Sequence, residues 1–140
     1  MKEVVRAHGH ENVTAEHGST LELTTDDFLT PAGDCILGIE ADRVPADFDD
    51  EFVATCRDRD ATITAVLEVD DAEARVVGRG HPEMTFESER SLVVRTSDYV
   101  DDRTVMVDAD AAAGDIDREL VETLSDGADV RLTLRVETGG

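Results

Sequence analysis

The chain has 140 residues, with 34 acidic and 13 basic side chains and a formal net charge of -21. This length is typical of one domain, and no apolar run reaches the roughly 18 residues that a membrane-spanning helix needs. The first residues also lack the basic and then apolar pattern of an export signal. We therefore expect a single soluble, cytoplasmic domain over residues 1–140 that has no membrane partner.

The acidic residues are spread along the chain in pairs and single positions, and Lys2 is the only lysine. An acidic patch that mimics nucleic acid or binds a basic partner would cluster them instead. At molar salt the Debye length falls to about 3 Å, so the repulsion within such a surface is screened. The charge therefore predicts a halophilic archaeal source and argues against nucleic acid as a partner.

Two segments of the chain resemble two later segments. Residues 9–29 match residues 80–100 at seven of 21 positions, and residues 37–56 match residues 105–124 at seven of 20. Chance would give only about one or two matches per 20 positions for this composition. The sequence thus predicts an internal duplication, with copies at residues 2–69 and 73–137.

Each copy predicts the same series of elements. In the first copy, strands are expected around residues 4–5 and at residues 20–24 and 35–39, followed by a helix at 47–56 and a strand at 63–69. In the second copy, the corresponding strands lie around residues 76–77 and at 92–95 and 104–107, before a helix at 115–124 and a strand at 130–136.

The two helices carry apolar residues at i, i+4, i+5 and i+8, which is the pattern of one buried helix face. Asp47 and Asp115 are the expected N-caps, unless the second helix starts earlier at Asp110. We predict a mainly β (α+β) fold, in which the two halves form a pseudo-twofold β-sandwich or barrel with about one helix each.

Three histidines near the start form a candidate metal site: His8, His10 and His17. Alternation along a strand places His8 and His10 on one face. Zinc sites need three or four ligands, and no cysteine or carboxylate at a matching spacing completes this set. The alternative, which we favour, is that these histidines are surface or turn residues.

A turn that leads into a buried strand carries Asp34 and Cys35. A thiol there could be a nucleophile activated by a histidine, so the candidate catalytic residues are His10, His17, Asp34 and Cys35. Equally, Cys35 could be a buried structural thiol, which is the interpretation that we favour. With no export signal and only two cysteines, both thiols are expected to be reduced.

Basic residues are scarce, so those of the second copy stand out. Arg95, Ser97 and Arg103 are candidate ligand-binding residues, because arginine forks suit carboxylate and phosphate groups. No glycine-rich phosphate loop of the usual patterns is found, and the sequence identifies no cofactor.

Residues that differ between the copies were free to diverge, which predicts one asymmetric site. We expect Gly9 and His10 to face Gly80 and His81 across one cleft, with the second copy's arginines at its rim. The function predicted is a small-molecule-binding protein or enzyme that uses this His/Asp/Cys site. The alternative is a non-catalytic protein-interaction module, and the oligomeric state is not predicted.

Several motifs carry a resemblance to a known family. They are GHENV with His17, LTPAGDCILGI, RTSDY and DRTVMVDADAAAGDIDREL. With these motifs the chain resembles an archaeal family that is known only as domain of unknown function 371. The resemblance covers nearly the whole chain and implies a β-sandwich-like or barrel-like domain and an archaeal source, without implying an activity.

Overall fold

The computed structural model describes residues 1–138. Eight strands and two short α-helices form the domain, together with two 3-10 turns. The elements in chain order are β1 (Lys2–His8), β2 (Thr20–Thr24), β3 (Ile36–Gly38), η1 (Pro45–Asp47), α1 (Asp50–Cys56), β4 (Thr62–Val69), β5 (Ala72–Arg79), β6 (Ser91–Arg95), β7 (Thr104–Met106), η2 (Ala113–Asp115), α2 (Arg118–Ser125) and β8 (Asp129–Glu137). The fold is therefore mainly β, as predicted.

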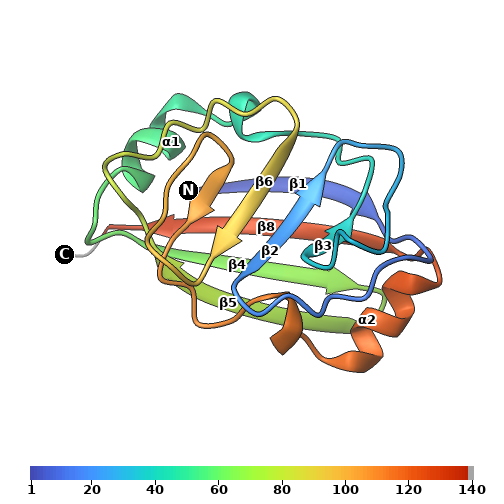
Figure 1. Cartoon of the computed structure of the whole chain (residues 1–140). Helices are drawn as coiled ribbons and strands as arrows, with labels where there is room; N and C mark the ends of the chain where they lie inside the picture. Colours follow the sequence, from blue (N-terminus) through green and yellow to red (C-terminus); the bar gives the residue numbers. More distant parts are fainter. Residues whose placement is uncertain (139–140) are drawn as a thin grey trace.

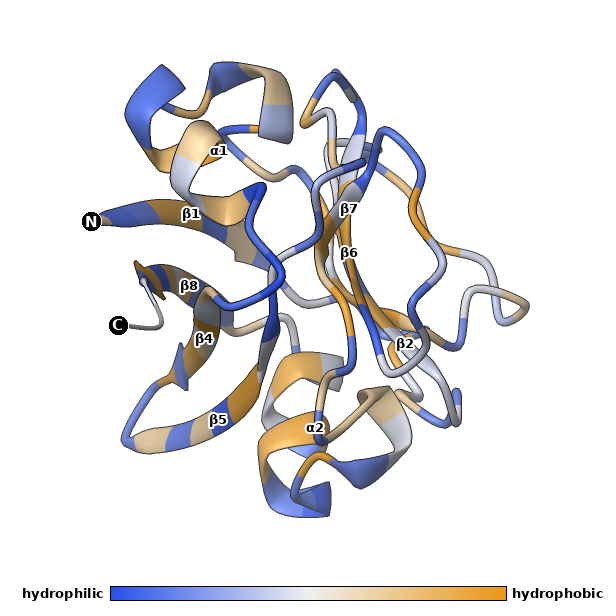
Figure 2. Cartoon of the chain, turned by 90° about the vertical axis from the view of Figure 1, so that its left-hand side faces the viewer, coloured by the Kyte–Doolittle hydropathy of each residue, from blue (hydrophilic) through white to orange (hydrophobic). Residues whose placement is uncertain are grey.

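The strands form two sheets of four that pack face to face (Figure 1). Sheet A has the order β1-β8-β4-β5 and is antiparallel throughout. Sheet B has the order β3-β2-β6-β7, in which the central pair is antiparallel and both outer pairs are parallel. Seen edge-on, α1 and α2 cover opposite sides of the space between the sheets (Figure 2). The domain is a β-sandwich closed by two helices.

The same order of elements occurs in residues 2–69 and in residues 72–137. In each sheet the corresponding strands are also placed symmetrically, with β4 and β8 at the centre of sheet A and β2 and β6 at the centre of sheet B. The predicted duplication would produce this arrangement. No helix among the described residues is both long enough and apolar enough to cross a membrane.

The core lies between the sheets. In the strands of sheet A, buried side chains largely alternate with more exposed ones, whereas every residue of β6 and β7 is buried. In β1, Val5 and Ala7 are buried while Lys2 and Arg6 are exposed. Such alternation turns every second side chain towards the opposite sheet. Three phenylalanines, Phe48, Phe52 and Phe86, pack at one end of the core with ring centroids 5.6–6.4 Å apart. Apolar burial across the two sheets thus holds the sandwich together.

The helices begin two residues later than predicted. The expected caps Asp47 and Asp115 end the 3-10 turns η1 and η2, and accept hydrogen bonds from the backbone amides of Val44 and Ala112. Asp49 and Asp117 are the N-caps of α1 and α2, and accept from the amides two residues on. Earlier helix initiation at Asp110 is likewise not observed, because η2 intervenes.

Two glycines allow each half to pack against the helix of the other. A Cβ atom on Gly9 would lie 1.8 Å from the backbone oxygen of Leu124 in α2, and one on Gly80 would lie 2.0 Å from that of Cys56 in α1. No side chain fits at such distances. The segment after β1 is therefore fixed to α2, and the segment after β5 to α1.

Candidate functional site

The predicted site residues lie in different parts of the sandwich. His8 is at the end of β1 on the outer face of sheet A. His10 and His81 follow glycines that pack against α2 and α1, on opposite sides of the domain. The expectation that these two turns face each other across one cleft is therefore wrong, because each turn is held by a different helix.

His8 forms an ion pair with Glu40, with 2.8 Å between Nε2 and Oε1. Its other ring nitrogen, Nδ1, lies 2.9 Å from the backbone oxygen of Gly9. The hydrogen bond to Glu40, followed by that to Gly9, raises the pKa of His8 above its usual value of 6.5. In the second half, Arg79 and Asp108 form the equivalent pair at 3.4 Å. His8 thus places an imidazole, whose charge depends on pH, at the position where the other half has an arginine.

A cavity of about 530 Å³ opens beside His8. It is lined by residues of both charges. The acidic ones are Glu40, Asp42, Glu68, Asp70 and Asp129, and the basic ones are Arg6 and Arg131. These residues come from β1, the loop after β3, the β4–β5 hairpin and β8, so only the folded chain brings them together.

His10 and His17 have structural roles in turns. Nδ1 of His10 accepts a hydrogen bond from the Asn12 amide at 3.0 Å. Nδ1 of His17 accepts from the amides of Ser19 and Thr20 at 3.2 and 3.1 Å. An accepting nitrogen carries no proton, so in both rings the proton of the neutral form is on Nε2.

Ser88 occupies in the second half the position that His17 occupies in the first. Its Oγ accepts hydrogen bonds from the amides of Arg90 and Ser91, at 3.2 and 3.3 Å. His81 likewise repeats the turn of His10, since its Nδ1 accepts from the Glu83 amide at 3.0 Å. Both halves therefore make these turns in the same way, so the contacts of His10 and His17 are structural and do not mark a site of the first half alone.

The three histidines do not form a metal site in the structure. Among residues 1–138, no group of three or more histidine, cysteine or acidic side chains is arranged to hold a metal ion. His8 is paired with Glu40, whereas His10 and His17 cap their own turns. The metal set His8, His10 and His17 stays a prediction that this geometry does not support.

The structure does bring His17 close to the segment that carries Cys35. The hydroxyl of Thr20, the first residue of β2, lies 3.1 Å from Nδ1 of His17, and β2 pairs with β3, which begins directly after Cys35. The backbone oxygen of Asp34 accepts from the His17 amide at 3.3 Å. His17, Asp34 and Cys35 therefore lie together at the edge of sheet B where β2 and β3 pair.

The chemistry around Cys35 favours a protonated thiol. Its Sγ lies 3.6 Å from Oε1 of Glu22, to which it donates a hydrogen bond. Burial, and then the negative charge of Glu22, raises the pKa of Cys35 to about 11. A nucleophilic cysteine needs the opposite environment, with cations or helix amides that stabilise the thiolate. The catalytic set His10, His17, Asp34 and Cys35 also stays a prediction.

Arg95 and Arg103 come together around one carboxylate. Asp101 accepts from Arg95 at 2.9 Å and from Arg103 at 3.0 Å, while Arg95 also donates to Thr104 at 2.9 Å. Burial raises the pKa of Asp101, but hydrogen bonds from Arg103 and the charge of Arg95 outweigh it and hold the pKa at about 2. The guanidinium of Arg95 also stacks on Tyr99, 4.8 Å from the ring centroid.

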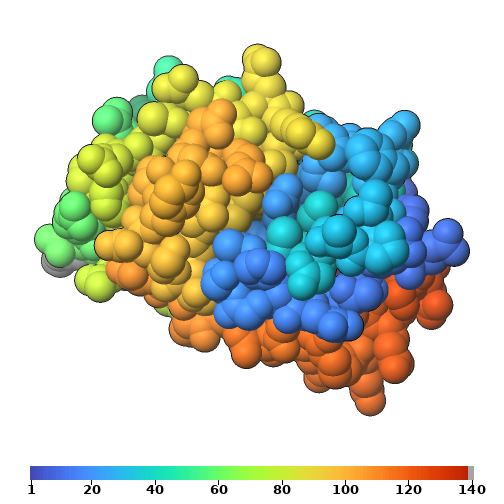
Figure 3. Space-filling view, viewed as in Figure 1, coloured from blue at the N-terminus to red at the C-terminus, as the bar shows by residue number. Residues whose placement is uncertain are grey.

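These contacts occupy the two arginines that were expected to bind a ligand. Ser97 is nearby in sequence, but its hydroxyl accepts from the Tyr99 amide at 3.3 Å. Figure 3 shows this side of the molecule, where segments of the first half, in blue and cyan, meet segments of the second half, in yellow and orange. Ligand binding by Arg95, Ser97 and Arg103 stays a prediction.

Sequence reasoning missed most of the residues that line the His8 cavity. Arg6, Glu68 and Arg131 occupy exposed positions of alternating strands, where charged residues are ordinary. For Arg6 and Arg131 the one signal was that basic residues are scarce in this chain, and Glu68 had none. The alignment that brings them into one row is set by strand pairing, in which Arg131 faces Arg6 on one side and Glu68 on the other.

Comparisons with known proteins identify a family and assign it no activity. The model of the family described as "Domain of unknown function (DUF371)" matches residues 5–137. The chain is also 38% identical, over 130 residues, to an uncharacterized protein of Methanocaldococcus jannaschii. That match covers 93% of this chain and 96% of the relative. The chain therefore belongs to the archaeal family DUF371.

Proposed function

We propose that this protein binds a small zwitterionic molecule in the cavity beside His8. The observation that carries the proposal is a space of about 530 Å³ lined by two guanidinium groups and five carboxylates. Ligand sites commonly measure about 300–1,000 Å³ and hold a few polar groups that converge on the ligand. A molecule that carries both an ammonium and a carboxylate group would match both kinds of lining residue.

The two arginines would take the anionic group. Arg6 and Arg131 are direct neighbours on β1 and β8, and neither forms an ion pair with a carboxylate within the described chain. Two adjacent forks can hold one carboxylate through charge-assisted hydrogen bonds. Glu68, Asp70 and Asp129 would take the ammonium group, since they also have no ion-pair partner there.

His8 would make binding depend on pH. Its pKa is raised by the hydrogen bond to Glu40, so the ring keeps its positive charge to a higher pH than an ordinary histidine does. Protonation adds a cation to a cavity in which acidic residues outnumber basic ones. A ligand's ammonium group would then bind less tightly below the pKa of His8 than above it.

An enzymatic role at Cys35 is the second candidate. It is supported by the hydrogen bond from the His17 amide to the backbone oxygen of Asp34, which places His17 beside the segment that carries Cys35. The raised pKa of the thiol and the use of His17 Nδ1 by two backbone amides count against it. We therefore place the binding function at His8 first.

The environment in which the protein works is also a proposal. A net charge of -21 supports a salt-rich cytoplasm of a halophilic archaeon, where counterions screen the acidic surface. The rarity of lysine, which occurs once, agrees with this.

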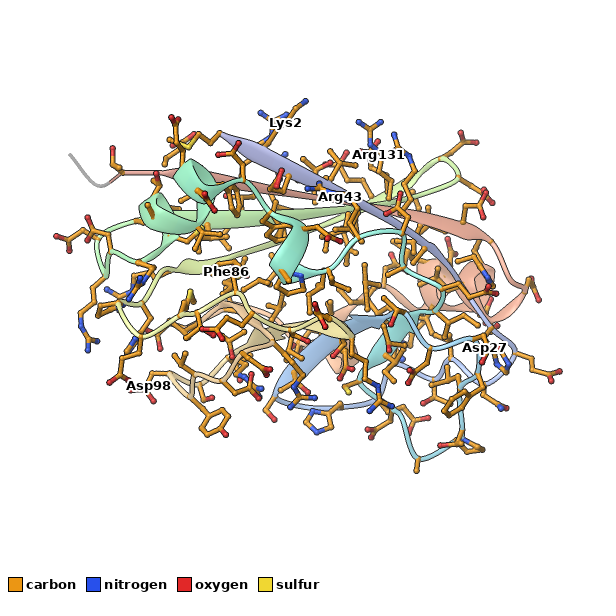
Figure 4. The ribbon with its side chains drawn as sticks, turned by 90° about the horizontal axis from the view of Figure 1, so that it is seen from above. Lys2, Asp27, Arg43, Phe86, Asp98 and Arg131 are labelled. Atoms are coloured by element: carbon orange, nitrogen blue, oxygen red, sulfur yellow. The ribbon has the colours of Figure 1, made fainter. Side chains whose placement is uncertain are left out.

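Titration of the protein with free L-glutamine, followed through amide and imidazole signals in NMR spectra, tests the proposed function. We expect shifts at Arg6, His8, Asp129 and Arg131, and binding at least fivefold weaker for propionamide, which lacks both charged groups. Asp129→Asn should weaken glutamine binding, whereas Asp27→Asn, on the opposite side of the molecule, should not (Figure 4). Equal affinities for both compounds, or shifts elsewhere only, would contradict the proposal.

A further inference from the structure

The outer face of sheet A carries a surplus of basic side chains. Six of the chain's 13 basic residues point outward from its strands: Lys2, Arg6, Arg75, Arg79, Arg131 and Arg135. The same strand positions hold only four of the 34 acidic residues: Glu68, Glu73, Asp129 and Glu137. At these strand positions cations therefore outnumber carboxylates in a strongly acidic protein, although the loops beside Arg6 and Arg131 add Glu40, Asp42 and Asp70.

Four of these cations form two rows across β1 and β8. Arg6 lies opposite Arg131, and Lys2 lies opposite Arg135. In the described chain no carboxylate lies within 4.0 Å of any of the four charged groups. Like charges that face each other across two strands destabilise a sheet. We call these four residues the cation rows.

Shorter and less polar side chains lie between the cation rows. Val4 is paired with Thr133, which is paired with Val66 on the next strand, and Thr133 and Val66 are only 6% and 9% exposed. A hollow of about 360 Å³ lies over Thr133 and Val66, and its rim is formed by Glu68, Glu73, Arg75 and Arg135. The cation rows therefore flank a shallow strip with a small, uncharged floor, where a side chain of a bound segment can lie.

We propose that this face of sheet A docks an extended acidic segment of a partner protein. In each strand the cation rows are four residues apart, which corresponds to about 13 Å at a rise of about 3.3 Å per residue. An extended peptide has the same rise, so acidic side chains at positions i and i+4 would reach both rows. The side chain at i+2 points to the same face and would lie over Val4, Thr133 and Val66.

Charge complementarity selects this partner over nucleic acid. Proteins that bind single-stranded nucleic acid on a sheet stack its bases on aromatic side chains, and β1, β4, β5 and β8 contain no phenylalanine, tyrosine or tryptophan. The net charge of -21 would also repel a long polyanion. A short peptide with two carboxylates contacts only the outer strand positions of sheet A, where cations outnumber carboxylates. Figure 4 shows Lys2 and Arg131 pointing out from one side of the molecule, with Asp27 and Asp98 on the other.

The direct test is an NMR titration at 1 M KCl with the peptide Gly-Asp-Ser-Val-Thr-Asp-Gly. Its aspartates are four positions apart, with valine midway. A peptide of the same composition, Gly-Asp-Asp-Val-Thr-Ser-Gly, has adjacent aspartates and serves as the control. We expect the first peptide to shift the amide signals of β1 and β8 and to bind at least fivefold more tightly than the control.

Two double variants locate the binding surface. Lys2→Gln with Arg135→Gln removes one cation row and should weaken peptide binding at least fivefold. Arg57→Gln with Arg59→Gln changes the net charge equally at exposed positions between α1 and β4, and should leave binding unchanged. Loss of binding in both variants, or none in either, would overturn the proposal. Tighter binding of an oligouridylate than of the peptide would overturn it in favour of nucleic acid.

Arg6 and Arg131 belong both to the cation rows and to the proposed small-molecule cavity, but different variants test the peptide surface and the cavity. Lys2 and Arg135 do not line that cavity, so their variant should still bind glutamine. His8→Ala, by contrast, changes the cavity and leaves both cation rows in place. Each proposal can therefore fail without the other.

Discussion

The carboxylate of Asp101 lies 2.9 Å from the guanidinium of Arg95, which is itself 8% exposed at the end of β6. A buried arginine without its counter-charge is costly, so this ion pair ties the 96–103 loop to sheet B.

Replacing Asp101 should destabilise the domain. Its pKa is held at about 2 instead of 3.8, which corresponds to roughly 2 kcal/mol of folding stability at neutral pH. Because the folded pKa is lowered, this stability is present above about pH 4 and is lost as the pH falls through about 2. We expect Asp101→Asn to lower the free energy of unfolding in urea by about 2 kcal/mol at pH 7. Asp26→Asn, which breaks a pair with the exposed Arg90, should have a much smaller effect.

The ion pair of His8 with Glu40 predicts a pH-dependent stability. The raised pKa of His8 means that the protonated pair stabilises the fold fully below about pH 6.5 and less as the pH rises through the folded value. An NMR titration of His8 should give a pKa above 6.5, and Glu40→Gln should lower it. A His8 pKa that Glu40→Gln leaves unchanged would contradict this assignment.

The equivalent pair of the second half provides the control for His8. A guanidinium group stays charged throughout this pH range, so Asp108→Asn, which breaks the pair with Arg79, should change the urea midpoint by the same amount at pH 6 and pH 8. Glu40→Gln should reduce the midpoint more at pH 6 than at pH 8.

The environment of Cys35 predicts that its thiol reacts slowly with alkylating reagents. With a pKa of about 11, Cys35 should react with iodoacetamide more slowly than free cysteine at pH 8, and faster as the pH rises. Removing the charge of Glu22 with Glu22→Gln should speed the reaction. Mass spectrometry can follow it, with the fully buried Cys56 as an internal reference. Rapid alkylation of Cys35 at pH 7 would instead favour a catalytic thiolate.

The acidic surface predicts that the fold depends on salt. Carboxylate repulsion is screened at molar salt but acts over about 10 Å at 0.1 M, while a domain of this size has a total stability of only about 5–15 kcal/mol. We expect the thermal midpoint to fall clearly between 2 M and 0.1 M KCl. An unchanged midpoint over this range would contradict the halophilic interpretation.

The alternating strands were predictable because side-chain burial in a sandwich repeats every two residues. The helix starts were missed by two residues, since Asp47 and Asp49 are equally good caps by type and only the 3-10 turn before α1 separates them. The difference in residue type between His17 and Ser88 suggested a functional difference between the two copies. In the structure, each residue supplies one acceptor atom to the equivalent turn of its own half.

The site at His8 could not be predicted because its members meet only through long-range pairing. Asp129 lies opposite His8, while Glu68 lies beside Arg131, although these residues are far apart in the chain. Sequence periodicity places each of them on an exposed strand face, but it does not tell which strands are neighbours.

The position of β8 has a consequence for how the domain folds. Among the strands of the described chain, β1 pairs with β8 alone, although the two are far apart in sequence, and β8 lies between β1 and β4. Until β8 is in place, the apolar side chains and the unpaired backbone amides of β1 are open to other chains. Folds dominated by such distant pairings form slowly, and their unpaired strands are prone to aggregate. Refolding of this domain is thus expected to be slow, with β1 as the strand that is exposed to aggregation.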